Sequence, residues 1–491
     1  MSSLPRRQLT IVSNRGPVVH EAIDGERTTT RGSGGLVSAL RGLFGTHDVT
    51  WVACAITAED RLIVHERDGQ AETEHDAAGN PFRLRLATPD PHDFDLAYNT
   101  IANPLLWFIQ HGLHDIGQSA IVNEETRAAW AAYRRYNAAL ASEAALECDA
   151  DAVLVHDYQL YLMPAMLREL GVATPILHFT HIPWPGPDDW RLLPIDLRTE
   201  LLHGLLGADI IGFQTAHDVA NFLATCEAHL PDCTVLPAGQ TVRVQRDRSE
   251  RDVLIRAYPI SIDPAELRAH LDLPAVKAAS ARLAQSRPER MILRVDRADP
   301  SKNIVRGFHA LDRLLARRPD LLGHVGMVAL LTPSRLGVPE YATYLATIRQ
   351  TVADVNERHA RDGWFPITLR VGDNFPEVVA AYQQYDVLLV NAIADGMNLI
   401  AKEGPLVNAV DGVVVLSCRA GAFEELEPFV LTIDPLDVEE TAAQLEQALD
   451  LPAAERATRA AGLRGFIEQH DVARWISLQL HDLEALPGAR R

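Results

Sequence analysis

The stretch Met291-Ile292-Leu293-Arg294-Val295-Asp296-Arg297-Ala298-Asp299-Pro300-Ser301-Lys302 decides the fold, because a change of periodicity takes place within it. Its apolar start is typical of a buried strand, and apolar residues then recur with a helical period at positions 304, 308, 311 and 314. We therefore expect a strand, a tight loop and a helix, with Asp299 as N-cap and Pro300 as the first helical residue.

The start of that helix is a candidate anion site. The N–H groups of a first helical turn are unpaired and lie at the positive end of the helix dipole, so they attract phosphate. Arg297 and Lys302 add two positive charges beside them. On this stretch alone, a capped surface helix with two solvated cations explains the pattern equally well.

Length and composition indicate a large globular protein. The chain has 491 residues, of which 47% are hydrophobic and 23% charged, enough for two or three domains with full cores. No apolar run reaches the length of a membrane span and residues 1–7 lack the core of a signal peptide, so we expect a cytoplasmic protein that does not bind membranes. Its five cysteines are dispersed, which favours reduced thiols over a disulfide framework or a zinc site.

The net charge limits the partners that the chain can bind. A formal charge of −20 argues against a nucleic-acid surface, which requires a broad basic face. A small anionic substrate would need local cations at loop ends, because the general field of the protein repels it.

The first half contains strand-like runs with polar residues at their ends. Residues 9–13 lead to Arg15, residues 152–155 to His156 and Asp157, and residues 175–180 to His181. A fourth run ends in Gln214-Thr215. Ligands bind at the carboxyl ends of strands in open α/β sheets, so these residues are candidate ligand contacts.

Three other features of this half are weaker signals. The glycine-rich segment 31–36 precedes a helical pattern but does not fit Gly-x-Gly-x-x-Gly, which favours a plain loop. His178 and His181 are three residues apart on a strand and point to opposite faces, so a metal site shared with Asp157 is disfavoured. The aromatic cluster at 94–111 is more typical of a core than of a ligand platform.

A connector at residues 258–264 separates this half from a second one of the same design. Further strands begin near positions 291, 325, 367, 386 and 412, with helical patterns between them. Alternating strands and helices predict parallel sheets, hence an α/β protein of two doubly wound Rossmann-like domains with a cleft between them. We expect domains at residues 1–260 and 261–465, and a helix at about 466–486 that packs back on the first.

A second constellation follows the strand that ends at Val390. If a helix begins near Gly396, Asp395 and Glu403 lie about 12 Å apart along it at about 1.5 Å per residue. That span suits the two ends of a nucleotide sugar, and both carboxylates can accept hydrogen bonds from hydroxyl groups. An N-cap aspartate and a solvated helix glutamate explain the same residues.

Taken together, these motifs resemble those of the trehalose-6-phosphate synthases, retaining glycosyltransferases of the GT-B fold. The resemblance covers nearly the whole chain and rests on the order and joint presence of the motifs. They are Val12-Ser13-Asn14-Arg15, Gly34-Gly35-Leu36, Tyr98, Asn103, Leu106-Trp107, His156-Asp157-Tyr158, His181-Ile182-Pro183, residues 204–209, Ile211-Gly212-Phe213-Gln214-Thr215, Asp296-Arg297, Asp299, Lys302, Ser334-Arg335, Asp395-Gly396-Met397-Asn398-Leu399 and Glu403.

The resemblance implies roles for individual residues. Donor-binding residues would be Gly34, Gly35, Arg297, Lys302, Asp395, Gly396, Met397, Asn398, Leu399 and Glu403. Acceptor-binding residues would be Arg15, Tyr98, Trp107, Asp157 and Arg335. The catalytic set would be His181, which contacts the transferred glucose, with Asp157, Arg297, Lys302 and Asp395.

The resemblance also implies a reaction. Glucose would pass from a nucleoside-diphosphate glucose to glucose 6-phosphate with retention, and the departing diphosphate would help to take the acceptor proton. No metal or other cofactor is expected, because Arg297, Lys302 and the helix ends can neutralise the charge. The sequence leaves the base of the donor (UDP, GDP or ADP) and homo-oligomerisation open.

Three departures from the family pattern keep alternatives open. Asn303 follows Lys302 where glycine is usual, Trp184 replaces a different aromatic residue, and Gly404-Pro405 follows Glu403. The alternatives are a glycosyltransferase or pseudo-glycosyltransferase with another phosphorylated acceptor, such as glycerol 3-phosphate or a cyclitol phosphate, and a catalytically silent sugar-phosphate sensor.

The retained residues favour the synthase over these alternatives. Pseudo-glycosyltransferase relatives tend to lose the first-strand arginine and the Asp-Gly-Met pattern, whereas this chain keeps Arg15, Tyr98 and Met397. A silent sensor would not need His181, the two cations at 297 and 302, Asp395 and Glu403 together.

Overall fold

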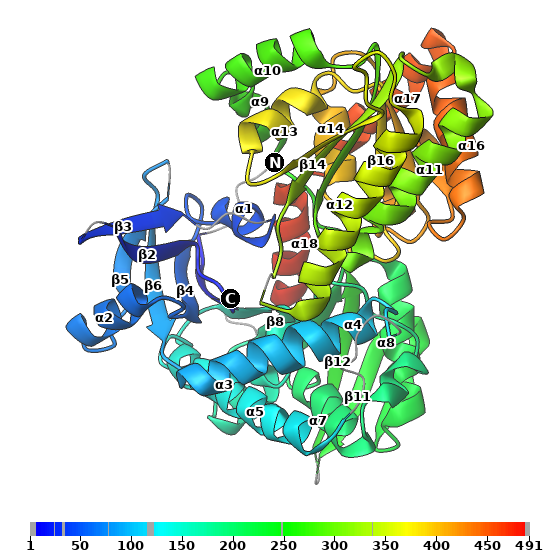
Figure 1. Ribbon diagram of the computed structural model, residues 1–491. Helices are drawn as coiled ribbons and strands as arrows, with labels where there is room; N and C mark the ends of the chain where they lie inside the picture. The colour runs from blue at the N-terminus through cyan, green and yellow to red at the C-terminus, as the bar shows by residue number, and fades with distance from the viewer. Residues whose placement is uncertain are drawn as a thin grey trace. The chain divides into compact units, whose positions relative to one another are not determined.

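The computed structural model describes residues 6–23, 25–31, 35–76, 78–114, 122–246, 249–335 and 337–486. The chain forms two compact units (Figure 1). Unit 1 comprises Met1–Tyr258 together with Ala473–Arg491, and unit 2 comprises Pro259–Val472. The division at Tyr258 lies two residues before the predicted end of the first domain at 260.

Unit 1 is built on a ten-stranded sheet, parallel from β12 to β6 and antiparallel at both edges. Its central strands are buried on both faces, which explains their near-continuous apolar sequences. In spatial order the strands are β10 (Cys233–Leu236), β11 (Thr241–Arg246), β12 (Ser249–Ala257), β9 (Ile210–Phe213), β8 (Ile176–Phe179), β7 (Ala152–His156), β1 (Gln8–Ser13), β4 (Asp48–Cys54), β6 (Pro81–Ala87) and β5 (Glu72–His75).

Helices and a hairpin complete unit 1. The hairpin is β2 (Val18–Ile23) with β3 (Glu26–Arg31). The helices are α1 (Gly35–Arg41), α2 (Ala58–Glu66), α3 (Pro91–Leu96), a π-helical segment Ala97–Leu106, α4 (Trp107–Gln110), α5 (Glu124–Ala145), α6 (Met163–Glu169), α7 (Ile195–Leu205), α8 (Ala216–His229) and α18 (Val472–Glu484).

Helix α5 holds two loops of unit 1 in place. Asn123 and Thr126 form a capping box at its start, and its buried side includes Tyr133 and Tyr136. The Tyr136 hydroxyl donates to Asn14 Oδ1 at 2.6 Å, after β1. The Tyr133 hydroxyl donates to the Tyr158 carbonyl at 2.8 Å, after β7.

Unit 2 contains a six-stranded parallel sheet in the order 3-2-1-4-5-6 of a Rossmann-like domain. Spatially, the strands are β15 (Ile367–Val371), β14 (Val325–Thr332), β13 (Arg290–Arg297), β16 (Val387–Val390), β17 (Val413–Ser417) and β18 (Leu431–Ile433). Its helices are α9 (Pro264–His270), α10 (Pro274–Ser286), α11 (Ile304–Arg317), α12 (Pro339–His359), α13 (Phe375–Tyr382), α14 (Ile400–Val407), α15 (Phe423–Leu426), α16 (Val438–Asp450) and α17 (Ala453–Gln469).

Both sheets are doubly wound, as the sequence predicted. In unit 1 the strand order reverses between β1 and β7, and in unit 2 between β13 and β16. The four apolar positions that predicted α11, namely 304, 308, 311 and 314, are all fully buried in the core of unit 2. Among the described residues, no helix combines the length and the apolarity that a membrane span requires.

Two predicted helix starts are wrong. Pro300–Lys302 form a single 3₁₀ turn, and α11 begins only at Ile304, because Asn303 has a left-handed backbone (φ 57°) that no α-helix includes. Asp299 makes no capping hydrogen bond. The helix expected near Gly396 is α14, which begins at Ile400, since Asn398 is also left-handed (φ 72°). Asp395 and Glu403 therefore do not share a helix, and the 12 Å spacing does not apply.

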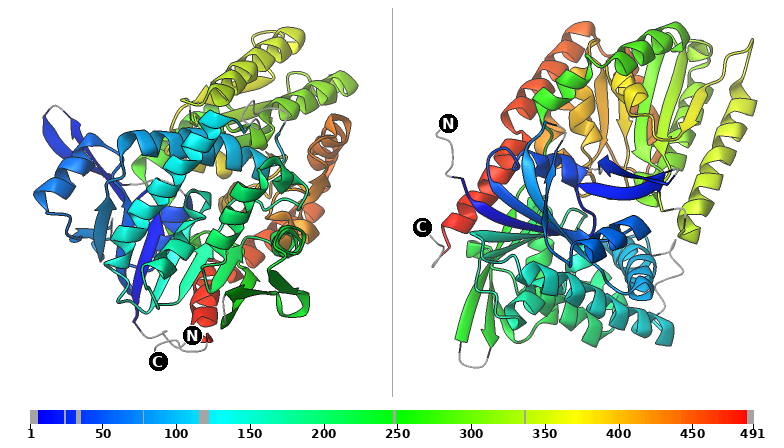
Figure 2. Two further views of the ribbon diagram at one scale, coloured as in Figure 1. Left: turned by 90° about the horizontal axis from the view of Figure 1, so that it is seen from below. Right: turned by 90° about the vertical axis from the view of Figure 1, so that its left-hand side faces the viewer.

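The predicted C-terminal helix is likewise divided in two. Helix α17 ends at Gln469, where His470 leaves the helical region, and α18 begins at Val472. Helix α18 belongs to unit 1, where the Tyr258 hydroxyl donates to Asp482 Oδ2 at 2.7 Å and Arg7 pairs with Glu484. Figure 2 shows it as the red helix close to the green strands of that unit.

Candidate active site

The carboxyl edge of the unit 1 sheet brings together residues from adjacent strands β7, β8 and β9. The His181 backbone N–H donates to Asp157 Oδ1 at 3.2 Å. The His181 ring contacts His156 Nδ1 through Nε2 at 3.2 Å and Gln214 Nε2 through Nδ1 at 3.4 Å. Asp157 and His181, to which the sequence assigned roles, thus lie together, and His156 and Gln214, which were also candidate ligand contacts, join them.

Asp157 has an unusual backbone conformation. Its φ of 78° and ψ of 169° fall in a region that is essentially restricted to glycine. Its N–H donates to the Phe179 carbonyl at 2.8 Å, so the strained residue is fixed at both its backbone and its side chain. These two hydrogen bonds hold the carboxylate at the strand end.

The histidines at this edge are neutral at pH 7. Burial lowers the pKa of His181 to about 3 and that of His178 to about 3. Burial, together with the neighbouring His181 and His178, also holds the pKa of His156 well below its usual value. His181 therefore acts as a neutral hydrogen-bonding group and adds no positive charge.

The remaining predicted residues of unit 1 lie in three environments. Arg15 follows β1 and has an exposed side chain. Tyr98 is half-buried and stacks on Phe94 with ring centroids 5.6 Å apart, whereas Trp107 is 1% exposed and stacks on His111 at 4.0 Å. Their acceptor role stays a prediction. Gly35 is the exposed first residue of α1, and Gly34 lies outside the described residues.

In unit 2, an ion pair spans the switch point between β13 and β16. Lys302, five residues after β13, pairs with Asp395, five residues after β16. Asn398 Nδ2 donates to Asp395 Oδ2 at 3.0 Å, and Met397, 3% exposed, anchors the loop by accepting from the Ala422 N–H at 2.8 Å. The segment 395–399, which includes Gly396 and Leu399, is therefore a structured loop.

Buried charged groups around Lys302 determine its protonation state. Burial lowers its pKa, but the carboxylates of Asp395 and Asp296 outweigh that effect and the net pKa is raised, so Lys302 stays protonated. Burial raises the pKa of Asp296 to about 6 despite Arg294 and Lys302. Arg294 is fully buried and pairs with Asp296 at 3.0 Å. Lys302 is therefore a protonated ammonium at this edge, with Asp395 as its carboxylate partner.

Two arginines flank a buried carboxylate beside this pair. Arg297, with 56% of its side chain exposed, pairs with Asp299 Oδ2 at 2.9 Å. Burial raises the pKa of Asp299, but Arg297 and Arg335 outweigh that effect, so its net pKa is lowered. Arg335 donates to the Tyr341 hydroxyl at 2.6 Å. Arg297 and Arg335 therefore lie near each other, although the sequence assigned one to the donor and the other to the acceptor.

Glu403 lies on the first turn of α14. The Tyr382 hydroxyl donates to its Oε2 at 2.9 Å. Burial raises the pKa of Glu403, and the bond from Tyr382 opposes that shift. The half-buried carboxylate is oriented by one hydroxyl and has further lone pairs for a second.

The structure explains the three departures from the family pattern. Asn303 occupies a left-handed position that glycine also suits, and its Nδ2 donates to the carbonyls of Asn391 at 2.9 Å and Pro435 at 2.7 Å. Trp184 is a core residue that stacks on Trp190 at 4.3 Å. Gly404 lies where a Cβ would come within 2.7 Å of Leu388 Cδ2. Backbone conformation and hydrogen bonds thus fix Asn303, whereas packing restricts positions 184 and 404.

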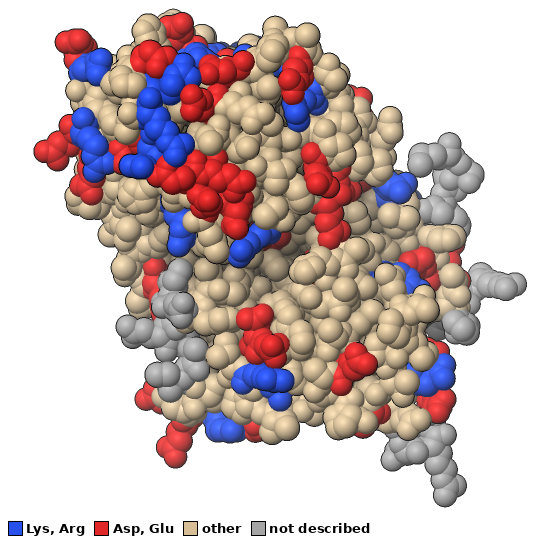
Figure 3. Space-filling view, turned by 90° about the vertical axis from the view of Figure 1, so that its right-hand side faces the viewer, with Lys and Arg blue, Asp and Glu red and all other residues tan. Residues whose placement is uncertain are grey.

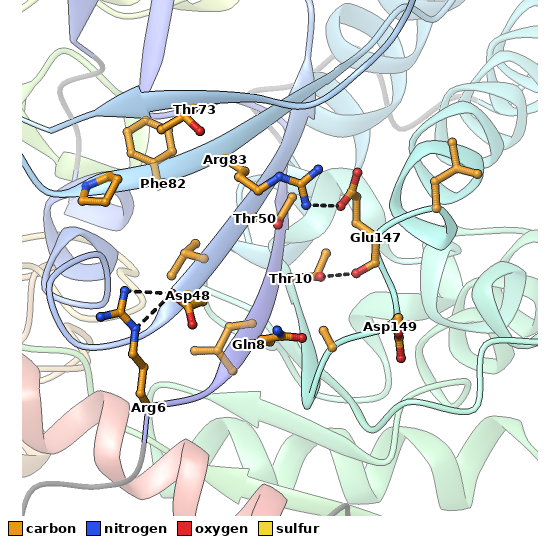
Figure 4. Close-up of a pocket in the computed structure, with 15 residues that line it drawn as sticks. Arg6, Gln8, Thr10, Asp48, Thr50, Thr73, Phe82, Arg83, Glu147 and Asp149 are labelled. Carbon is orange, nitrogen blue, oxygen red and sulfur yellow. Dashed lines mark hydrogen bonds and ion pairs between the residues drawn. The ribbon is translucent and has the colours of Figure 1, made fainter.

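A cavity of about 320 Å³ lies at the opposite, amino edge of the unit 1 sheet (Figure 4). Its labelled residues come from the starts of β1 and β4, from β5 and β6, and from the segment after α5, and ion pairs such as Arg6 with Asp48 at 2.7 Å line it. Predicted site residues such as Asp157, His181, Lys302 and Asp395 follow the carboxyl ends of strands instead. On the face shown in Figure 3, acidic and basic side chains are interspersed.

Comparison with known proteins identifies a family. Residues 7–485 match the model of glycosyltransferase family 20. The chain is 31% identical to a validamine 7-phosphate valienyltransferase of Streptomyces hygroscopicus subsp. jinggangensis, over 98% of this chain and 95% of that one. It is 32% identical to the UDP-forming α,α-trehalose-phosphate synthase 1 of Aspergillus niger, over 95% and 88%.

Solved structures show the same fold. A UDP-forming α,α-trehalose-phosphate synthase of Burkholderia xenovorans in complex with glucose 6-phosphate has a TM-score of 0.80 at 27% identity, covering 97% of this chain and 100% of that one. An E. coli structure described as trehalose-6-phosphate bound with UDP-2-fluoro glucose has a TM-score of 0.83 at 28% identity, covering 98% and 99%. The architecture is the GT-B fold, with two Rossmann-like domains.

Proposed function

This chain belongs to glycosyltransferase family 20, and from that premise we propose that it is an α,α-trehalose-phosphate synthase. It transfers glucose from a nucleoside-diphosphate glucose to glucose 6-phosphate with retention at the anomeric carbon. The observation that carries the proposal is the ion pair of Lys302 and Asp395 at the switch point of unit 2, with the exposed Arg297 beside it. Switch points are where open α/β sheets bind nucleotides.

The donor binds at the carboxyl edge of unit 2. Lys302 and Arg297 meet the diphosphate, since a charge-assisted contact to phosphate is stronger than a neutral hydrogen bond. Asp395 and the amides of residues 396–399 hold the glucose, and Glu403, oriented by Tyr382, accepts from the ribose. Gly35 and His181 are further donor contacts, contributed by unit 1.

The acceptor roles follow the sequence prediction. Arg15, Tyr98, Trp107 and Asp157 belong to unit 1, whereas Arg335 belongs to unit 2 beside Arg297. Asp157 accepts from sugar hydroxyls through its carboxylate, which also accepts from the His181 N–H. The arginines bind the phosphate of glucose 6-phosphate.

Catalysis consists of positioning and of charge stabilisation on the leaving group. As the bond from the anomeric carbon to the diphosphate breaks, negative charge grows on the diphosphate oxygens, and Lys302 and Arg297 stabilise it. The acceptor hydroxyl attacks from the same face and gives its proton to the leaving diphosphate, so retention requires no covalent enzyme intermediate. Neutral His181 can hydrogen-bond the glucose without repelling the positive charge that develops on it. We propose that no metal takes part in this step.

A second candidate is a pseudo-glycosyl transfer. The 31% identity over 98% of the chain to a valienyltransferase that is named for validamine 7-phosphate favours it. Both candidates use a phosphorylated acceptor, so the cations of the site do not separate them.

The deciding experiment is an assay of UDP-, GDP- and ADP-glucose with glucose 6-phosphate, with identification of the product by NMR. We expect trehalose 6-phosphate from at least one donor, and no product from Lys302→Ala. A chelator should leave the rate unchanged. If no glucose donor yields product while a valienyl donor with validamine 7-phosphate does, the second candidate is correct.

A further inference from the structure

Three side chains of unit 1 converge at the edge of its sheet, away from the predicted active-site residues. His203 lies in the last turn of α7, Cys233 is the first residue of the edge strand β10, and Asp232 immediately precedes it. His203 Nε2 lies 3.1 Å from Asp232 Oδ2. The ligand atoms of all three residues lie within 4.8 Å of one another, and within the described ranges this is the one group of its kind.

The spacing of these atoms suits a tetrahedral metal ion. Zinc binds nitrogen and oxygen at about 2.0–2.2 Å and sulfur at about 2.3 Å, so atoms bound to one tetrahedral ion lie about 3.3–3.7 Å apart. The separation of His203 Nε2 and Asp232 Oδ2, 3.1 Å, is slightly shorter than that range, so the two atoms would move apart by about 0.2 Å on binding an ion. Cys233 Sγ lies within 4.8 Å of the other two ligand atoms, close enough for a side-chain adjustment to complete the site.

The local backbone holds the three residues in place while leaving them accessible. The Cys233 N–H donates to the Leu230 carbonyl at 3.1 Å, and the Leu230 N–H donates to the Cys226 carbonyl at 2.9 Å. The turn before β10 is therefore fixed to the end of α8. Side-chain exposures of 23% for His203 and 53% for Asp232 allow an ion to enter and a water to complete its coordination.

We propose that His203, Asp232 and Cys233 form a binding site for a zinc-type divalent transition metal. Thiolate and imidazole together select zinc or cobalt over magnesium and calcium, which prefer oxygen ligands. The bound ion ties the end of α7 to the edge strand β10. Because α7 leads into the amino end of β9, the site lies at the edge of the sheet opposite Asp157 and His181, so its role is structural and independent of the transfer reaction.

Cobalt titration of the metal-free full-length chain, without a histidine tag, tests the site. We expect one cobalt ion per chain, the near-ultraviolet absorption of a cobalt–thiolate bond, and its loss on adding zinc. Cys233→Ser should abolish this absorption. His203→Ala and Asp232→Asn should weaken cobalt binding at least about 10-fold, since even loss of an outer-shell partner costs that much. Cys418→Ser is the matched control, because Cys418 is an exposed thiol elsewhere.

A second readout is thermal unfolding. Zinc should raise the unfolding temperature of the parent chain and of Cys418→Ser but not of Cys233→Ser or His203→Ala, because only a folded site binds the ion. Transfer activity should be the same with and without zinc. The proposal is overturned if the parent chain shows no thiolate absorption, if Cys418→Ser rather than Cys233→Ser removes it, or if His203→Ala and Asp232→Asn bind cobalt as the parent does.

Discussion

Gly307 on α11 offers a test of the buried charge network behind Lys302. A Cβ at this position would overlap with Arg294 Nη1 and come within 3.3 Å of Asn391 Oδ1 and of Leu389 Cδ2. Arg294 has no exposed surface. Its guanidinium cannot move without losing contacts, because it pairs with Asp296 at 3.0 Å and donates to Asn391 and to the Lys302 carbonyl. In Gly307→Ala, the guanidinium must therefore shift away from its partners.

The expected change in the free energy of unfolding has two parts of opposite sign. Replacing glycine by alanine inside a helix stabilises by about 1 kcal/mol. Breaking a buried charge pair by displacing one partner costs about 3–5 kcal/mol, whereas overpacking alone costs about 1–3 kcal/mol. Because three partners hold Arg294 in place, displacing it should break the charge pair. The net loss in the free energy of unfolding is then about 2–4 kcal/mol.

Gly465 on α17 is the matched control, because a Cβ there would meet no atom within 4 Å. Gly465→Ala should stabilise unit 2 by about 1 kcal/mol, so the two variants should differ in sign. Hydrogen exchange measured by mass spectrometry resolves each unit, with peptides of unit 1 as the internal reference. If Gly307→Ala protects the amides of α11 as Gly465→Ala protects those of α17, Arg294 can yield, and the rigid network that we describe does not exist.

Three other predictions concern single residues. Asn303→Ala should destabilise unit 2 by about 2–4 kcal/mol, because alanine disfavours the left-handed backbone and two buried hydrogen bonds are lost. Asn303→Gly should recover the share of this loss that comes from the backbone conformation, and hydrogen exchange of the α11 amides measures both changes. Arg15→Ala should raise the KM for glucose 6-phosphate and spare kcat, and an unchanged KM would remove its acceptor role. Hydrogen bonds to Asp60 and Glu74 raise the pKa of the buried His20 side chain from 6.5 to about 9. The stabilisation that protonated His20 provides is therefore complete below about pH 6.5 and is lost as the pH rises through about 9. Melting curves of the parent and His20→Gln should therefore converge at alkaline pH, and a constant difference would contradict the shift.

The sequence was sufficient for the order of elements and for the edge of each sheet that carries polar residues. Periodicity and the alternation of strands and helices encode those features, and the four apolar positions that predicted α11 are buried. The starts of α11 and α14 could not be predicted, because Asn303 and Asn398 adopt left-handed backbones. Asn303 is held there by the carbonyls of Asn391 and Pro435, 88 and 132 residues away, which no local pattern reveals.

Contacts between side chains from different strands could not be predicted from the sequence either. His156 and Gln214 belong to sequence motifs that predicted the site, but nothing in their spacing showed that both contact the ring of His181. Likewise, His203 and Cys233 are thirty positions apart in the chain, and a single cysteine gives no metal-binding pattern. Such pairs become visible only when the sheet order brings the strand ends together.

Backbone strain gives an independent argument for the location of the site. Of the eight non-glycine residues with positive φ in the described ranges, four follow strands β7, β13, β14 and β16 at their carboxyl ends. They are Asp157, Asn303, Arg335 and Asn398. Such conformations cost about 1–3 kcal/mol each, and glycine would adopt them more cheaply. A side chain at these positions must therefore compensate through its contacts or its chemistry.

Asn303 and Asn398 do so by hydrogen bonds within unit 2. Asp157 lies in the region where glycine is favoured most, and its carboxylate accepts from the His181 N–H at 3.2 Å. The cost of this conformation is explained if, as we propose, the carboxylate also binds the acceptor sugar.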